Sequence, residues 1–314
     1  MKPPVLVAAR FLPRLLGRLS ERYTLHGLER PQPDAIPTAA REARALITVG
    51  GIRTDAALMD ALPKLGLIAC YGTGYEGVDR AAARARGIIV THAGDTNATA
   101  VAEFAFGLVI ATVRGILRGD RFARAGRWRG DIIERTASTP ELAGQRLGIC
   151  GLGAIGTRIA IRAAAFEMEI GYHNRRPRAD QPYAYYPTLM GLAHWADILM
   201  VSVRADATNF HAVNKEVLAA LGPRGHLVNI SRGIAVDEAA LCDALEAGVI
   251  ASAALDVFEH EPTIPDRLKA LDNVVLTPHM AAISANAQRA QRDAMFANLE
   301  AFFAGRPVFT PVSE

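Results

Sequence analysis

Residues 146–166, RLGICGLGAIGTRIAIRAAAF, decide the fold of this chain. Gly151, Gly153 and Gly156 have the G-x-G-x-x-G spacing, between the apolar run RLGIC and the helical run TRIAIRAAAF. Such a turn lets the backbone approach a pyrophosphate and directs a helix N-terminus at it. The spacing alone is weak, but its strand–turn–helix context favours a dinucleotide-binding turn over an ordinary βα turn.

The next strand ends in the sequence GYHNRRPR, residues 171–178. A dinucleotide turn normally has an acidic residue about twenty positions later, which binds a ribose hydroxyl. This chain has Asn174, Arg175 and Arg176 there. A carboxylate would repel a 2′-phosphate, whereas the amide can donate a hydrogen bond and the guanidinium groups can pair with the phosphate. The sequence predicts NADP as cofactor, with a solvated basic loop as the alternative.

Compact apolar runs alternate with helical runs along most of the chain, which is typical of parallel sheets covered on both faces. We expect an α/β fold of two doubly wound parallel-sheet lobes. The first lobe spans 1–95 and is completed by a C-terminal helical stretch at about 285–314; the second spans 96–284. The runs are PVLVA, ALITVG, LGLIACYG and GIIVTHA, then RLGIC, EIGYHN, DILMVSV, HLVNIS, ASAALDV and NVVLTPH.

The composition excludes several classes of protein. The chain has 314 residues, half of them hydrophobic, and a formal charge of +3, which is too small to indicate nucleic acid by itself. Its three cysteines, Cys70, Cys150 and Cys242, show neither a metal-ligand spacing nor a disulfide framework, so we expect a cytoplasmic protein without a metal. The apolar stretch at 101–113 is too short to cross a bilayer and is predicted to be a buried helix.

Three polar residues follow successive strands of the second lobe. Arg232 follows HLVNIS, Glu261 lies in EHEP after ASAALDVF, and His279 follows NVVLTP. The carboxyl ends of parallel strands meet at one edge of a sheet, where ligands bind. Singly, each residue could be structural. Together they predict a histidine acid polarised by a carboxylate, beside an anion-binding arginine, a set that suits hydride transfer to a 2-keto acid.

With these motifs the chain resembles the D-isomer-specific 2-hydroxyacid dehydrogenases, and within them the glyoxylate/hydroxypyruvate reductases. The resemblance covers nearly the whole chain through GTGYEGVD, NATAVAE, GLGAIG, NISRG, ALDVFEHEP and TPH. It implies a Rossmann cofactor domain inserted into a flavodoxin-like substrate domain. The expected activity is NADPH-dependent reduction of small 2-keto acids, with the preferred acid and the physiological direction left open.

The resemblance also implies residue roles. Arg232 would hold the substrate carboxylate and carbonyl, His279 would protonate the carbonyl oxygen, and Glu261 would orient His279 and favour its charged form. Backbone N–H groups around Thr73 and Gly74 would bind the carboxylate. The expected cofactor contacts are Gly151, Gly153, Ala154, Ile155, Gly156, Asn174, Arg175, Arg176, Val203, Ile230, Ser231 and Asp256, the last of these at the nicotinamide carboxamide. Arg204 departs from the family's usual turn and leaves the local contacts there open.

The segment RGILRGDRFARAGRWRG, residues 114–130, holds six arginines and Trp128. A nucleic-acid surface is disfavoured because aromatic residues are sparse there. A solvated helix face without a binding function is an alternative. The region resembles the arm exchanged between subunits of a family dimer, which would bring Trp128 near the partner's substrate. We therefore expect a homodimer that binds neither nucleic acid nor membrane.

The sequence leaves two alternative functions open. The chain could be a dinucleotide-binding regulatory protein on the same fold, similar to a co-repressor, or an enzyme similar to phosphite dehydrogenase. A formate dehydrogenase is disfavoured, because those enzymes replace the residue that corresponds to Glu261.

Overall fold

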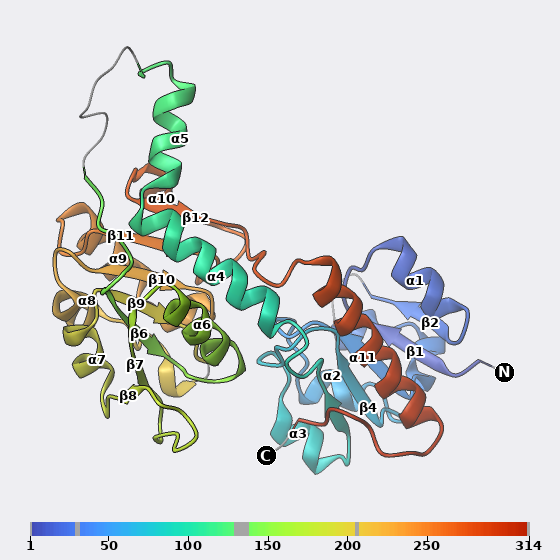
Figure 1. Cartoon of the computed structure of the whole chain (residues 1–314). Helices are drawn as coiled ribbons and strands as arrows, with labels where there is room; N and C mark the ends of the chain where they lie inside the picture. Colours follow the sequence, from blue (N-terminus) through green and yellow to red (C-terminus); the bar gives the residue numbers. More distant parts are fainter. Residues whose placement is uncertain (1, 29–31, 129–137, 205–206, 313–314) are drawn as a thin grey trace. The chain divides into compact units, whose positions relative to one another are not determined.

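The computed structural model describes residues 2–28, 32–128, 138–204 and 207–312. The chain forms two compact units (Figure 1). Unit 1 comprises Met1–Asn97 and Ser284–Glu314, and unit 2 comprises Ala98–Ile283.

Unit 1 contains a parallel five-stranded sheet in the order β2-β1-β3-β4-β5. Helices α1 and α11 pack on one face of the sheet, through Leu15, Leu19 and Leu299, and α2 and α3 cover the other. The strands are β1 (Pro4–Val7), β2 (Thr24–Gly27), β3 (Ala45–Thr48), β4 (Leu67–Cys70) and β5 (Ile89–Thr91), and the helices are α1 (Pro13–Ser20), α2 (Ala56–Asp60), α3 (Arg80–Ala85) and α11 (Ala285–Phe303), with short 3-10 helices η1 (Pro33–Ala35) and η2 (Thr38–Glu42).

Side-chain caps mark the start of α2 and α11 in unit 1. Asp55 accepts a hydrogen bond from the Leu58 N–H at the start of α2, and Ser284 accepts one from the Ala287 N–H at the start of α11. Each cap satisfies a backbone donor that the first helical turn leaves unpaired. The strand order is the flavodoxin-like one, in which the direction of chain progression reverses between β1 and β3.

Unit 2 contains a parallel seven-stranded sheet in the order β12-β11-β10-β9-β6-β7-β8. This is the Rossmann order with one more strand at the edge. Helices α4 and α6 pack on one face, and α7, α8 and α9 on the other. The strands are β6 (Arg146–Cys150), β7 (Glu169–His173), β8 (Ala184–Tyr185), β9 (Ile198–Val201), β10 (His226–Asn229), β11 (Ser252–Leu255) and β12 (Val274–Leu276), and the helices are α4 (Ala98–Val113), α5 (Ile116–Arg124), α6 (Ala154–Ala165), α7 (Leu189–Trp195), α8 (Lys215–Leu221), α9 (Glu238–Glu246) and α10 (Asp266–Ala270), with η3 (Ala207–Asn209) and η4 (Gly233–Ala235). The predicted pair of doubly wound parallel sheets is confirmed.

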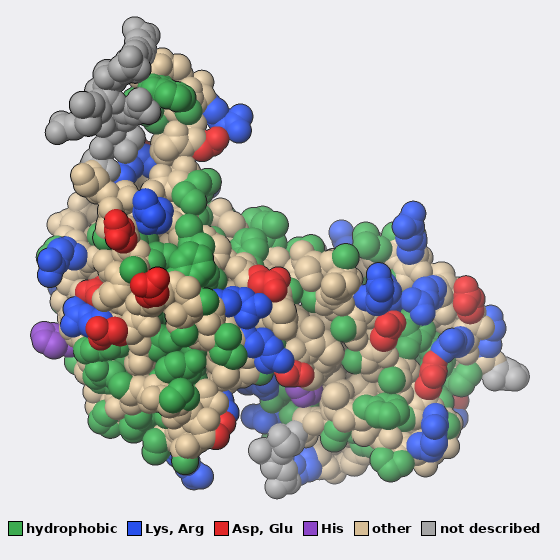
Figure 2. Space-filling view, viewed as in Figure 1, with side chains coloured by type: hydrophobic (Ala, Val, Ile, Leu, Met, Phe, Trp, Pro, Cys, Tyr) green, Lys and Arg blue, Asp and Glu red, His purple; other side chains and the backbone are tan. Residues whose placement is uncertain are grey.

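Helices α4 and α5 differ in their environment. The apolar helix α4 packs in the core of unit 2 through residues such as Ala105 and Val109, as its sequence predicts. Helix α5 has no buried residue, and Ile116 and Leu117 are exposed on it. Figure 2 shows hydrophobic side chains beside charged ones on this projecting helix.

Within the described ranges, no single helix is long and apolar enough to cross a bilayer. Taken together, α4 and α5 have sufficient length and apolar content, but they bend by 62° at their junction.

Candidate active site

The glycine turn between β6 and α6 has the geometry that its spacing predicts. Gly151 has a φ of 102°, and a Cβ atom there would lie 2.7 Å from the Val203 nitrogen. A Cβ on Gly156 would lie 2.2 Å from the Gly151 oxygen, so α6 starts in direct backbone contact with the turn. At Gly153, the N-cap residue of α6, a Cβ would meet nothing within 4 Å, and a glycine has no side chain to cap the first helical turn. The turn therefore leaves open space and N–H groups at a helix N-terminus, which fits a bound pyrophosphate.

Asn174, at the end of β7, holds this turn. Its Oδ1 accepts a hydrogen bond of 2.7 Å from the Leu152 N–H. Arg175 and Arg176 follow on an exposed loop. A carboxylate at 174 could also accept this bond, so the asparagine keeps the turn's geometry while removing a negative charge. The two guanidinium groups remain accessible to an anion.

A third arginine of this run, Arg178, contacts the same turn and was missed in the sequence analysis. Its Nη1 donates to the Leu152 carbonyl at 2.8 Å and to the Thr157 hydroxyl at 3.2 Å. It also pairs with Asp180, and hydrogen bonds from Arg178 and Gln181 lower the pKa of Asp180 to about 2. Arg178 is the last residue of GYHNRRPR, but the rule for dinucleotide turns predicts a role only for the residue at the end of the strand.

The structure brings together the three residues that follow β10, β11 and β12. His279 Nδ1 lies 2.7 Å from Glu261 Oε2, and Glu261 Oε1 accepts a hydrogen bond of 3.1 Å from the Phe258 N–H. Burial acts to raise the pKa of Glu261, but the hydrogen bond and charge of His279, with the charge of Arg232, bring it below its usual value. Glu261 is therefore a carboxylate at neutral pH and can pair with a protonated imidazole. The side chain of His279 is 42% exposed, so a substrate can reach this ring.

His279 has a φ of 49°, in the left-handed region that side chains other than glycine rarely adopt. The turn that imposes this conformation is held by Asp256, which is fully buried. The Asp256 carboxylate accepts hydrogen bonds from the Thr277 hydroxyl at 2.7 Å and from the N–H groups of Met280 and Ala281, both at 2.9 Å. Residues held in sparsely populated conformations cluster at functional sites. Contact of Asp256 with a nicotinamide carboxamide stays a prediction.

The turn that carries Glu261 is fixed by residues that the sequence analysis did not single out. Glu259 pairs with His211 Nε2, and its N–H donates to Glu238 Oε1 at 2.8 Å. Burial raises the pKa of Glu238. A Cβ on Gly233, which follows Arg232, would lie 1.9 Å from the Phe258 carbonyl carbon, so the loops after β10 and β11 touch through backbone.

The predicted cofactor residues after β9 and β10 lie at the same edge of the unit 2 sheet. The Ser202 hydroxyl donates to the Gly151 carbonyl at 2.8 Å, which places Val203 beside the glycine turn. Ser231 donates through its hydroxyl to Asn229 Oδ1 at 2.9 Å, and Arg232 Nη1 donates to the Ser231 carbonyl at 2.7 Å. Beyond Arg204, whose carbonyl accepts a hydrogen bond from Asn209, the structure does not describe residues 205–206.

In unit 1, the predicted carboxylate-binding loop follows β4. Asn97 Nδ2 lies 3.4 Å from the Thr73 hydroxyl. A Cβ on Gly50 would lie 2.4 Å from the Gly74 carbonyl carbon, so the loops after β3 and β4 are in close backbone contact. In unit 2, the side chain of Trp128 is 60% exposed, and residues 129–130 of the predicted arm lie outside the described residues.

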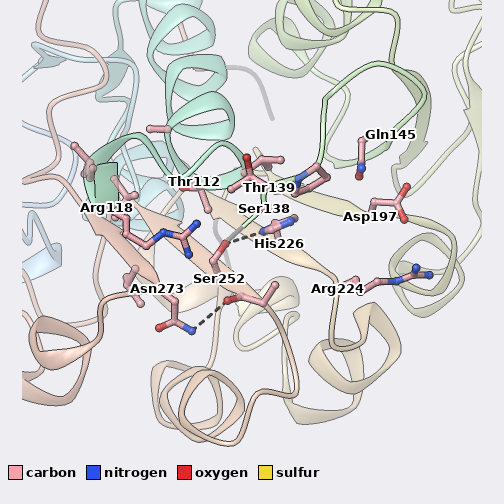
Figure 3. Close-up of a pocket in the computed structure, with 18 of the residues that line it drawn as sticks. Thr112, Arg118, Ser138, Thr139, Gln145, Asp197, Arg224, His226, Ser252 and Asn273 are labelled. Carbon is pink, nitrogen blue, oxygen red and sulfur yellow. Dashed lines mark hydrogen bonds between the residues drawn. The ribbon is translucent and has the colours of Figure 1, made fainter. Parts of the chain in front are cut away.

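A separate pocket of about 610 Å³ lies at the opposite edge of the unit 2 sheet, where β9 to β12 begin. Figure 3 shows Arg118, His226 and Ser252 gathered at this pocket, with His226 Nδ1 2.7 Å from the Ser252 hydroxyl oxygen. Burial lowers the pKa of His226. None of the predicted catalytic residues lines this pocket.

Comparison with known proteins agrees with this geometry. Residues 106–281 match the family model for the D-isomer specific 2-hydroxyacid dehydrogenase NAD binding domain. The chain is 38% identical to hydroxyphenylpyruvate reductase of Plectranthus scutellarioides over 94% of both proteins, and 39% identical to glyoxylate/hydroxypyruvate reductase A of Arabidopsis thaliana over 88% of both. Its structure is similar to that of the NADPH-dependent glyoxylate/hydroxypyruvate reductase from Sinorhizobium meliloti in complex with NADP and malonate, with a TM-score of 0.93 and 40% identity, covering 100% of this chain and 97% of the other.

Proposed function

Because the chain belongs to the D-isomer specific 2-hydroxyacid dehydrogenase family, we propose that it is an NADPH-dependent reductase of small 2-keto acids such as glyoxylate and hydroxypyruvate. The observation that carries the proposal is the contact of 2.7 Å between His279 and Glu261, beside the charge of Arg232. This arrangement supplies a proton donor and an anion-binding group at the edge of the sheet that also bears the glycine turn.

In the proposed mechanism, Arg232 binds the carboxylate and carbonyl oxygen of the keto acid, and N–H groups at Thr73 and Gly74 bind the carboxylate. Bound NADPH supplies the hydride. As negative charge develops on the carbonyl oxygen, His279 donates a proton to it from Nε2, because Nδ1 faces Glu261. Glu261 keeps the imidazole oriented and compensates its charge, the role that the carboxylate of a catalytic triad has toward its histidine.

The preference for NADPH rests on the loop after β7. Asn174 is already bonded to the glycine turn, and Arg175 and Arg176 are exposed where a 2′-phosphate would lie in a Rossmann fold. The name of the S. meliloti relative supports the same cofactor. We assign the cofactor domain to 96–284, and the substrate domain to 1–95 with the C-terminal helix at about 285–314.

We propose that the protein is a cytoplasmic homodimer. Helix α5 exposes Ile116 and Leu117, and contiguous exposed apolar surface typically marks an interface. The pocket at the amino-terminal edge of the unit 2 sheet adjoins this helix through Leu117 and Arg118, so a second copy of the chain would cover both. All three cysteines are free and buried, which fits a reducing compartment.

A direct test is the oxidation of NADPH and of NADH by the purified protein, each with glyoxylate, hydroxypyruvate and phenylpyruvate. The proposal predicts turnover with at least one of these acids, faster with NADPH. Tight binding of dinucleotide without turnover of any keto acid would favour the regulatory alternative, and turnover with phosphite alone would favour the phosphite dehydrogenase alternative.

A further inference from the structure

The carboxyl-terminal edge of the unit 1 sheet carries an aromatic pair that the proposed mechanism does not use. Sheets of this class bind ligands outside the carboxyl ends of their strands, where the strand order reverses, here between β1 and β3. Phe11 lies on the loop that follows β1, and Tyr71 directly follows β4. Their ring centroids are 5.3 Å apart at an interplanar angle of 56°. The edge where a ligand is expected is therefore partly apolar, with one phenol group.

Arg292 of α11 lies beside this phenol. The Tyr71 hydroxyl is 3.5 Å from the Gln288 carbonyl oxygen, and Arg292 is one helical turn further along α11. Helical side chains lean toward the N-terminus of their helix, so the Arg292 side chain leans toward Gln288 and Tyr71. Burial raises the pKa of Tyr71, and the positive charge of Arg292 acts in the opposite direction. The guanidinium and the phenol thus belong to one cluster.

Within the described residues, the guanidinium of Arg292 is poorly satisfied. Its Nε is buried and has no hydrogen-bond partner there. The ion pair that it forms, with Asp293 at 3.7 Å, involves a carboxylate that is 59% exposed, and such pairs contribute little. The Arg292 side chain itself is only 29% exposed. A buried charged donor without an acceptor is unfavourable, and an oxygen-bearing ligand would relieve this cost.

We propose that Arg292 and Tyr71 form a subsite for an oxygen substituent on C3, or further along the chain, of the keto acid. This inference rests on the proposed function. Tyr71 is two residues before Thr73 on the loop expected to hold the substrate carboxylate, and two residues span at most about 7 Å. This is the length scale of a short keto acid, so a substrate anchored at Thr73 reaches Tyr71 with its distal end. The substrate class is 2-keto acids with a distal hydroxyl or carboxylate group, in preference to those with a plain alkyl group.

The test compares hydroxypyruvate and oxaloacetate with pyruvate. C3 of pyruvate is a plain methyl group, whereas C3 carries a hydroxyl group in hydroxypyruvate and a carboxylate group in oxaloacetate. Arg292→Met keeps an apolar stem and removes the charge and the donors. Arg289→Met is the matched control, because Arg289 is an exposed arginine on the same helix. Arg292→Met should lower kcat/KM for hydroxypyruvate and oxaloacetate roughly ten- to hundredfold, the range of a charge-assisted hydrogen bond, and change pyruvate less than about twofold. Tyr71→Phe should show the same selectivity with a smaller loss, and Arg289→Met should change none of the three.

An equal loss for all three acids in Arg292→Met would overturn the proposal, because it would place Arg292 at the shared carboxylate or in the fold. NADPH binding and the thermal midpoint, measured on the same variants, report folding separately. If no acid is reduced even by the unmodified protein, the proposed function fails on its own account. Calorimetric binding of hydroxypyruvate then decides the subsite, and equal affinity of the unmodified protein and Arg292→Met would contradict it.

Discussion

Replacing Asp256 with asparagine tests whether this residue shapes the catalytic turn or serves the cofactor. The carboxylate is fully buried and accepts three hydrogen bonds, one from the Thr277 hydroxyl and two from the N–H groups of Met280 and Ala281. An asparagine presents one oxygen and one NH2 group in the same space. Even with its oxygen toward Thr277 and Met280, the NH2 group would face the Ala281 N–H, and donor would meet donor.

The loss of stability can be estimated from this lost hydrogen bond. A hydrogen bond to a charged group contributes about 1.5–3 kcal/mol, and the Ala281 N–H would be left buried and unpaired. We therefore expect Asp256→Asn to lower the free energy of unfolding by about 2–3 kcal/mol. For a unit of this size, that corresponds to a fall of roughly 4–12 °C in the thermal midpoint. Because the turn carries His279, kcat should fall as well.

Thermal unfolding and steady-state kinetics, measured on the same protein samples, separate the two roles. Thr277→Val is the matched control, since it removes one donor to the carboxylate and leaves both backbone bonds, so its thermal midpoint should fall less. If Asp256→Asn unfolds at the unmodified temperature and shows only a raised KM for NADPH, the structural reasoning is wrong and the carboxamide contact is supported.

Three further predictions address the cofactor, the acid and the assembly. Arg175→Ala with Arg176→Ala should remove most of a roughly ten- to hundredfold preference for NADPH in kcat/KM and leave NADH turnover nearly intact; equal use of both cofactors by the unmodified enzyme would refute this. Because the pKa of Glu261 lies below its usual value, the stabilising contact with His279 should persist through neutral pH and be lost only as the pH falls through that lowered pKa. Glu261→Gln removes the negative charge at every pH, so the falling limb of the reduction profile should move to lower pH when hydride transfer limits the rate, and an unmoved limb would exclude this role. Light scattering should show a dimer at micromolar concentration, and Trp128→Ala should change the KM for the keto acid more than that for NADPH; a particle of 33.6 kDa alone would contradict the dimer.

The parts of the site that follow from the sequence are those carried by local spacing. The glycine turn has a fixed distance between strand and helix, and Arg232, Glu261 and His279 each come shortly after an apolar strand. Parallel strands place such positions at one edge of a sheet whatever the rest of the chain does. The position of each residue just after its own strand is therefore enough to predict that the three residues lie at the same edge of the sheet.

The supporting contacts could not be obtained in this way. His211 and Glu259 are 48 positions apart, and Glu238 bonds a backbone group 21 positions away. These contacts depend on the conformations of neighbouring loops at the edge of the sheet, and hydrophobic periodicity does not predict loop conformation. Arg178 shows a different limit, since its contact with Leu152 depends on how the loop after β7 folds back over the glycine turn.

The proposed role of Arg292 had no sequence signal either. An arginine within an amphipathic helix is typical of a solvated face, and Arg289 fits that description. Only the packing of α11 against β4 distinguishes the two, because it buries the Arg292 Nε beside Tyr71.

In the proposed mechanism, the step on which all others depend is proton donation from His279 to the carbonyl oxygen of the 2-keto acid. The most direct measurement is the initial rate of NADPH oxidation with hydroxypyruvate, at saturating concentrations of both, for the unmodified enzyme and for His279→Ala. We expect kcat of the variant to fall by roughly two to four orders of magnitude, the usual range for a general acid, with NADPH binding unchanged. A variant that keeps a kcat within a few-fold of the unmodified enzyme would contradict this role of His279.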